Sequence, residues 1–352
     1  TRPWEFPLNL KQVANYPTIV PESAWVPPLG YQSEGPFLVS VFQSLTGIDG
    51  FYWFTTQNPQ WRQPSSANGH FPSIGKWVFN TPELLGNFPA AALTYRQGYI
   101  QTGDAVIDEV RTPDDIWQRQ DPLISETRSF DPNRDQEFVQ TESDGTEAVY
   151  PLAFLSGPVQ VSYTDNPSET DTIADLSQYI DADNQMVRSV TGEVSWDYGK
   201  GLTWVDAPKA QGVTGFLSKQ DRIDLTDISL TSQNHYGTLW AVSLDGEAIA
   251  TSSRVLVQVG TRARPTNWET HATTWTDKND QTHQGFTVMN FGEPPWQVVE
   301  TSMELELRNS GVSRAIALDA NGMARNDVNI SLTQNNGGIT LVMPPDVNYL
   351  IL

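Results

Sequence analysis

Two stretches, Pro17-Thr18-Ile19-Val20-Pro21-Glu22 and Asp49-Gly50-Phe51-Tyr52-Trp53-Phe54, decide the fold expected for the first part of the chain. Each contains a short run of β-branched or aromatic residues, which is typical of a strand buried in a parallel sheet. Between them, apolar residues recur at helical spacing over residues 34–46, with Ser33 as the expected N-cap and Gly47 as the stop. The order strand, helix, strand predicts a βαβ unit with parallel strands.

Further helices are expected after this unit. Residues 89–96 have the composition of a helix, and Thr112-Pro113-Asp114-Asp115 is a helix start, with an N-cap followed by Pro at the first position. We therefore expect residues 1–125 to form an α/β region.

The pattern changes after about residue 140. Short runs rich in β-branched residues are separated by turn signals such as Asp245-Gly246 and Asn321-Gly322. The expected strands are residues 159–163, 186–190, 202–205, 228–231, 239–243, 255–259, 304–307 and 339–342. Such a pattern predicts an antiparallel β-sandwich or barrel. The expected fold class is thus α/β followed by all-β, with residues 126–145 as a linker and residues 146–352 as one or two β subdomains.

Composition excludes several classes of function. The chain has 352 residues, no Cys, and 21 Lys and Arg against 42 Asp and Glu, for a net charge of −21. That charge argues against nucleic acid or an anionic membrane as a partner, and the absence of Cys removes thiol chemistry and disulfides. No apolar stretch is long enough for a membrane helix. We expect an extracellular, cell-surface or periplasmic protein, and the absence of a leader in the first residues predicts that processing removed a segment or that the chain is part of a longer one.

A carboxylate and two indole rings are expected at one edge of the parallel sheet. Glu22 ends the first strand beside Trp25, and Trp53 ends the second. Ligands and catalytic groups gather at the carboxyl ends of parallel strands. Because indole faces pack on pyranose rings and a carboxylate stabilises or attacks an anomeric carbon, the arrangement favours a sugar site. A solvated loop residue is the simpler interpretation of Glu22 taken alone.

These stretches resemble the end of the (β/α)₈ barrel of clan A glycoside hydrolases. The resemblance implies that Glu22, at the end of the seventh strand, is the nucleophile and that Trp53, at the end of the eighth, lines a sugar subsite. Later segments are similar to the last helix, exit linker and β-rich module of large bacterial proteins of this kind: residues 95–99, 130–135, 195–202 and 243–246. The resemblance spans most of the chain and fixes neither the family nor the substrate.

The chain departs from a complete barrel in one respect. A (β/α)₈ barrel takes about 250 residues, and only about half of that length precedes the β-rich region. The acid/base carboxylate of the clan belongs to an earlier strand, so a missing N-terminal barrel segment or another subunit is the implied partner, together with a carbohydrate. Glu34 is the other carboxylate nearby; it is a candidate substrate-binding residue, or a first-turn residue favoured by the helix dipole.

The remaining candidates lie in the loop after Trp53 and in the linker. Trp61 is expected to be a sugar platform, and His70 to line the same cleft. Residues 131–137 alternate oxygen-bearing side chains as a Ca²⁺ loop does but lack its Gly and distal Glu. A solvated linker is therefore the favoured interpretation, with Ca²⁺ as the alternative, and we expect no other cofactor or metal. Two hypotheses follow: a retaining hydrolase of a β-linked poly- or oligosaccharide, this chain supplying the nucleophile half, or a non-catalytic glycan-binding, structural or assembly protein on a glycosidase-like frame.

Overall fold

The computed structural model describes residues 3–25, 29–54, 65–67, 71–73, 81–120, 122–124, 151–276, 280–335 and 337–352. Within these residues the protein is mostly β, with large antiparallel sheets, which is compatible with an all-β later part of the chain. None of the helices in this part of the chain is long and apolar enough to cross a membrane.

The largest sheet has nine strands, and all of its pairings are antiparallel. In spatial order its strands are β21 (Ile316–Leu318), β24 (Tyr349–Ile351), β17 (Val255–Gly260), β16 (Gly237–Ser243), β13 (Ala210–Gly215), β12 (Leu202–Ala207), β11 (Val194–Asp197), β10 (Met186–Arg188) and β9 (Ile180–Asp181). A second antiparallel sheet contains β14 (Ile223–Asp224), β15 (Ile228–Ser232), β20 (Met303–Leu307), β23 (Gly338–Val342) and β22 (Thr333–Asn335).

One face of the nine-stranded sheet packs against the five-stranded sheet. Leu239 and Val257 from the first sheet share a buried cluster with Leu305, Leu307 and Ile339 from the second, and none of these five side chains is more than 1% exposed. Removal of this apolar surface from water stabilises the pair of sheets.

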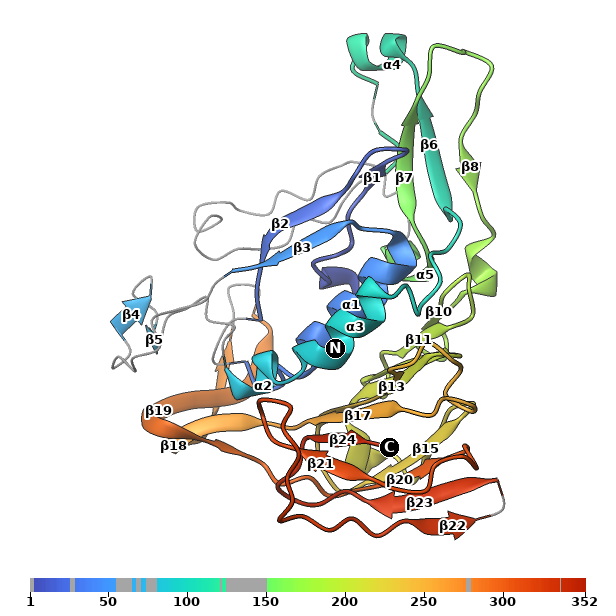
Figure 1. The fold of residues 1–352 in the computed structure, drawn as a ribbon. Coiled ribbons are helices and arrows are strands. Elements are labelled where there is room, and N and C mark those ends of the chain that lie inside the picture. Colours follow the sequence, from blue (N-terminus) through green and yellow to red (C-terminus); the bar gives the residue numbers. More distant parts are fainter. Residues whose placement is uncertain are drawn as a thin grey trace.

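The other face of the nine-stranded sheet packs against helices. These are α1 (Glu34–Thr46), α2 (Pro82–Leu85) and α3 (Phe88–Arg96), and Figure 1 shows α1 and α3 above this sheet. Phe37 of α1 lies with its ring centroid 4.4 Å from that of Trp240, and Phe42 lies 5.6 Å from Trp196. Both tryptophans are buried, and each has a neighbour in α1. The helices and the antiparallel part therefore share one core.

Local signals explain the bounds of α1. Gly47 ends the helix in the left-handed conformation at φ 74°, which glycine adopts without strain. Ser33 occupies the N-cap position, but its side chain accepts no capping hydrogen bond because its backbone is already helical. Ser33 therefore stands at the expected N-cap position, but its side chain does not cap the helix.

A third sheet projects from the body as an arm, seen at the top of Figure 1. Its order is β1 (Gln12–Val13), β7 (Val159–Tyr163), β6 (Ile107–Arg111) and β8 (Thr172–Ile173). Residues 159–163 form the predicted strand, but the strand pairs parallel with β1 and β6, so its assignment to the antiparallel region is wrong. The short helices α4 (Pro113–Trp117) and α5 (Ala153–Ser156) flank this sheet.

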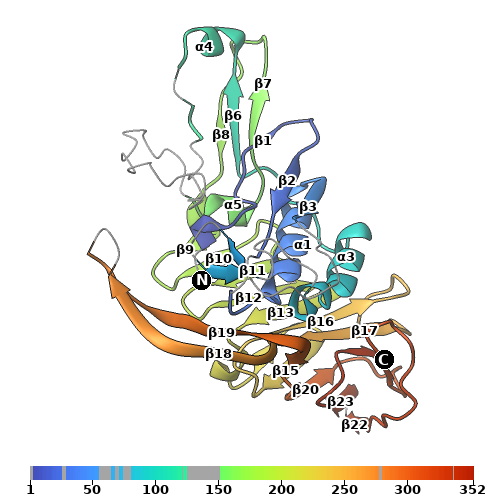
Figure 2. The ribbon, with the colours of Figure 1, turned by 90° about the vertical axis from the view of Figure 1, so that its left-hand side faces the viewer.

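A long hairpin also extends from the body, as Figure 2 shows. It consists of β18 (Ala263–Thr276) and β19 (Thr282–Val298), and most of its residues beyond the root are exposed. The remaining elements are β2 (Ile19–Ser23), β3 (Gly50–Trp53), β4 (Ser65–Ala67), β5 (Phe71–Ser73) and the short 3₁₀ turns Pro3–Glu5, Leu176–Gln178 and Leu217–Lys219.

Candidate active site at the carboxyl ends of β2 and β3

The parallel pair β2–β3 forms as the sequence predicts. Ile19 pairs with Gly50 and Val20 with Phe51, and α1 makes the connection between the two strands. Val20 is buried and belongs to the same core cluster as α1. The pair is thus a βαβ unit covered by helices on one face.

A bulge places Glu22 at the end of β2. The register shifts between Val20 and Ser23, so that Ser23 pairs with Trp53 and both Pro21 and Glu22 lie opposite Tyr52. Bulges interrupt the regular alternation of a strand and re-aim side chains, and they are frequent next to active sites. Glu22 is exposed, in contrast to the buried Val20 two residues earlier. The candidate nucleophile and Trp53 therefore lie at the same end of neighbouring parallel strands.

The two candidate tryptophans differ in exposure. Trp25 is 7% exposed, and its ring packs against Phe6 and, at 5.6 Å between centroids, against Trp53. Trp53 is half-buried and also contacts Phe51 and Phe88. Because Trp25 presents little surface, Trp53 is the ring with more area available to a ligand. Trp25 packs against Trp53 inside the protein.

Glu34 lies in the first turn of α1, at the same end of the sheet as Glu22. The Trp25 Nε1–H donates to Glu34 Oε1 at 3.3 Å, and the Tyr236 hydroxyl donates to Glu34 Oε2. Burial raises the pKa of Glu34, although both hydrogen bonds act in the opposite direction. This carboxyl group is therefore held by two donors, one of which comes from the antiparallel part of the chain.

Sequence reasoning missed Tyr236 and its surroundings. Tyr236 is buried, and its ring stacks on Tyr31 with 4.2 Å between centroids. Tyr31 also lies 5.3 Å from Phe216, and its hydroxyl is 3.4 Å from His235 Nε2. No local pattern joins Tyr236 to Glu34, because the two residues are 202 positions apart.

Glu83 is a second buried carboxylate, next to the loop before α1, and no local sequence pattern points to it. It accepts hydrogen bonds from the backbone N–H of Gln32 at 2.7 Å and of Ala263 at 3.1 Å, and forms an ion pair with Arg264 at 3.1 Å. Burial raises its pKa, while these partners act to lower it. With every oxygen engaged, Glu83 connects the loop before α1 to the root of the β18–β19 hairpin.

The other candidates cannot be placed. Trp61, His70 and the alternating oxygens of residues 131–137 lie outside the described residues. In the part of the chain that is described, no group of three or more His, Asp or Glu side chains could hold a metal ion.

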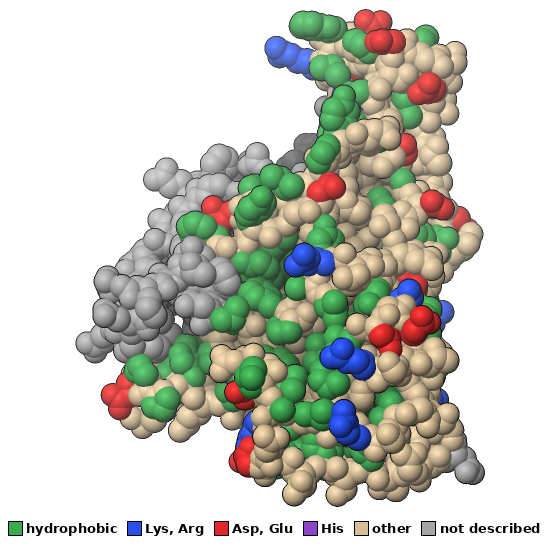
Figure 3. Space-filling model, in the orientation of Figure 1, with side chains coloured by type: hydrophobic (Ala, Val, Ile, Leu, Met, Phe, Trp, Pro, Cys, Tyr) green, Lys and Arg blue, Asp and Glu red, His purple; other side chains and the backbone are tan. Residues whose placement is uncertain are grey.

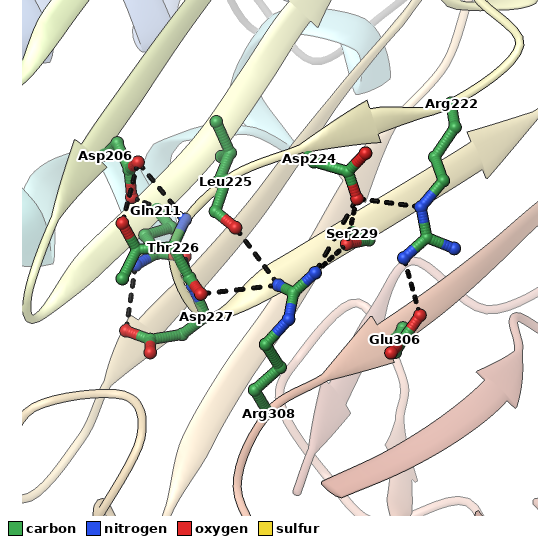
Figure 4. A network of polar contacts seen from close by, with 10 residues as sticks. All are labelled: Asp206, Gln211, Arg222, Asp224, Leu225, Thr226, Asp227, Ser229, Glu306 and Arg308. Carbon is green, nitrogen blue, oxygen red and sulfur yellow. Dashed lines mark hydrogen bonds and ion pairs between the residues drawn. The ribbon is translucent and has the colours of Figure 1, made fainter. Parts of the chain in front are cut away.

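A separate cluster of charged side chains joins the two antiparallel sheets (Figure 4). Arg222 bridges Asp224 and Glu306, each at 2.7 Å, and Arg308 donates to the backbone oxygen of Leu225 at 3.0 Å. Asp227 accepts from Gln211 at 2.9 Å. Because these charges are paired with one another, the cluster is best explained as a connection between β13, β14, β15 and β20.

The pH dependence of stability tests the environment of Glu34. Because its pKa is raised in the folded state, the folded protein binds a proton more tightly than the unfolded chain, and the associated stability is lost as the pH rises above the ordinary value of 4.5. Glu34→Gln removes this dependence. We expect the melting temperature of the variant, relative to the parent protein, to rise between about pH 4.5 and pH 7.5. A difference that stays constant or falls over this interval would contradict the assigned burial.

Comparison of the chain with protein-family models, with curated protein sequences and with solved structures finds no match.

Proposed function

We propose that the chain is part of a retaining glycoside hydrolase acting on a β-linked poly- or oligosaccharide, and that it supplies the nucleophile, Glu22. The observation that carries the proposal is the position of Glu22: exposed, in a bulge at the carboxyl end of β2, beside the end of β3 that bears Trp53. In this mechanism a carboxylate attacks the anomeric carbon while a second carboxyl group protonates the leaving oxygen.

Neighbouring residues have distinct roles in the proposal. Trp53 provides a ring surface for the sugar, Trp25 fixes the orientation of Trp53, and Glu34 fixes Trp25 through its indole N–H. Glu34 is not the acid/base group in this proposal, because both of its oxygens already accept hydrogen bonds. The loop with Trp61 and His70 remains a candidate wall of the sugar subsites.

The proposal includes further polypeptide that completes the site. Among the described residues, β2 and β3 form a sheet of their own, and on it Ile19 is 52% and Tyr52 61% exposed. A parallel sheet is normally covered on both faces, and open strand edges are normally paired or protected. A preceding barrel segment or another subunit would provide the missing strands and the acid/base carboxylate.

The alternative is a non-catalytic glycan-binding or assembly protein. The engagement of Glu34 favours it, because the carboxyl group nearest in sequence to Glu22 is occupied by Trp25 and Tyr236. In that case Glu22 would contact a sugar without forming a bond to it.

Covalent labelling separates the two functions. The protein, expressed in its natural host with any polypeptide that co-purifies, is incubated with aryl β-glycosides that carry a dinitrophenyl leaving group and a fluorine beside the anomeric carbon. A Glu22 oxygen then forms a bond to the anomeric carbon, the bond to the aryl oxygen breaks, and the electron pair leaves with dinitrophenolate. This step requires no proton, so it does not depend on the acid/base carboxylate.

We expect peptide mass spectrometry to find the fluoro-sugar on Glu22 and to find no adduct in Glu22→Gln. Glu247→Gln, at an exposed carboxylate of the antiparallel part, is the matched control and should still be labelled. Labelling of another residue, or no labelling by any of the glycosides, would refute the assignment of Glu22 and leave the non-catalytic alternative.

A further inference from the structure

The arm carries an open groove that the proposed active site does not use. Its volume is about 450 Å³, and it lies where β6 and β7 end, next to α4. Arg111 and Tyr163, the last residues of the two strands, pair with each other in parallel register. The groove is therefore at the carboxyl ends of neighbouring parallel strands, where ligands of open α/β sheets commonly bind.

Large apolar side chains are displayed at this groove. Trp117 is 84%, Tyr163 56% and Ile116 52% exposed. Figure 3 shows hydrophobic side chains gathered at the end of the arm, around α4. Exposed apolar groups gathered in this way mark binding surfaces more often than single exposed residues do.

The short helix that carries Trp117 is held in place by its cap. The Thr112 backbone N–H donates to Asp115 Oδ2 at 2.7 Å, and the Asp115 N–H donates to Thr112 Oγ1 at 3.3 Å. This reciprocal pair satisfies two backbone donors at the start of the helix. Trp117 is thus exposed on an ordered element.

Polar groups surround the rings, and their charges disfavour an anion. Arg111 donates to the Gln120 carbonyl at 2.7 Å and lies 3.6 Å from Glu109, which offsets its charge. Asp165 adds a carboxylate to the lining. The Thr164 hydroxyl accepts from the Asn166 N–H at 3.0 Å and keeps its own proton for donation. The groove offers two aromatic faces with donors and acceptors and without an excess of positive charge.

We propose that this groove is a second binding site, for a neutral sugar. Trp117 and Tyr163 provide the surfaces on which pyranose rings pack, while Thr164 and Asp165 hydrogen-bond to hydroxyl groups. The volume is in the range of small-molecule sites, about 300–1,000 Å³. The aromatic rings and the hydrogen-bonding groups beside them match the apolar faces and the hydroxyl groups of a neutral sugar.

Affinity electrophoresis of the full chain tests the site. Native gels contain laminarin, xyloglucan, galactomannan or xylan, and calorimetry with a hexasaccharide of the retarding polymer gives the affinity. We expect retardation in at least one gel, and a loss of about tenfold or more in affinity for Trp117→Ala and Tyr163→Ala. Tyr163→Phe keeps the ring and should retain most of the binding. Trp275→Ala, at another exposed tryptophan, is the matched control and should behave as the parent chain does.

Further variants separate this site from the proposed catalytic one. The gels and the calorimetry are therefore repeated in a Glu22→Gln, Trp53→Ala background, in which the proposed catalytic site is impaired, so that the loss caused by Trp117→Ala reports on the arm whether or not Glu22 is labelled. Absence of retardation in every gel, or equal affinity of Trp117→Ala and the parent chain, would overturn the proposal. Self-association that Trp117→Ala abolishes, without sugar binding, would identify a protein contact and would also overturn it.

Discussion

Replacing Trp240 with Ala is expected to lower the free energy of unfolding by about 3–5 kcal/mol, the usual cost of deleting a large aromatic side chain from a core. Trp240 is 0% exposed and lies between the nine-stranded sheet and α1, where its ring contacts Phe37. A Cβ on Gly212 would approach the Trp240 ring to 2.8 Å, so the neighbouring strand is already close. The substitution would leave a cavity between α1 and the sheet. Since both of these are regular elements, the surrounding structure has little freedom to close it.

Guanidinium unfolding followed by circular dichroism measures this loss. Trp275→Ala is the control, because Trp275 is 50% exposed on the β18–β19 hairpin and its removal should cost far less. A loss below about 1 kcal/mol for Trp240→Ala would mean that α1 does not pack on this sheet as described.

Replacing Glu83 with Ala is expected to cost about 3–5 kcal/mol, because one partner of a buried ion pair is removed and the other remains. The change leaves the Gln32 and Ala263 N–H groups without their carboxylate acceptor and Arg264, with 17% of its side chain exposed, without its counter-charge. The loss should appear in the same unfolding experiment.

Glu83→Gln is the informative comparison. Gln keeps an oxygen acceptor and the shape of the side chain, so it should lose less stability than Ala does. If the two variants lose equal stability, the ionic contact with Arg264 accounts for the effect, and the backbone hydrogen bonds do not. A loss below about 1 kcal/mol in both variants would contradict the structural role of Glu83.

Local sequence signals predicted elements well and their partners poorly. Residues 159–163 form a strand within the predicted bounds, yet alternation along a strand carries no information on whether its neighbour runs parallel. The β18–β19 hairpin was missed because Pro265, Gly292 and the pair Pro294-Pro295 are typical strand breakers. The backbone hydrogen bonds along the whole of this long hairpin outweigh the local preferences of these residues.

In the candidate site, too, the local sequence predicted the elements but not the contacts between distant residues. The order of strand, helix and strand was enough to place Glu22 and Trp53 at one end of a parallel pair. The bulge that separates Glu22 from the regular alternation could not be derived, because it depends on the register with β3. The burial of Trp25 and the contact of Glu34 with Tyr236 depend on packing across distant parts of the chain.

The shared core has a consequence for folding during synthesis. The contact between the Ala90 N–H and Gln258 Oε1 spans 168 positions, and the contact of Glu34 with Tyr236 spans 202. At a translation rate of about 5–20 residues per second, α1 leaves the ribosome roughly 10–40 s before β16. Until β11 to β13 and β16 are made, the apolar face of α1, with Phe37 and Phe42, has no sheet to pack on. Nascent chains stalled before residue 194 should therefore bind chaperones through this segment, and release should follow synthesis of β16 and β17.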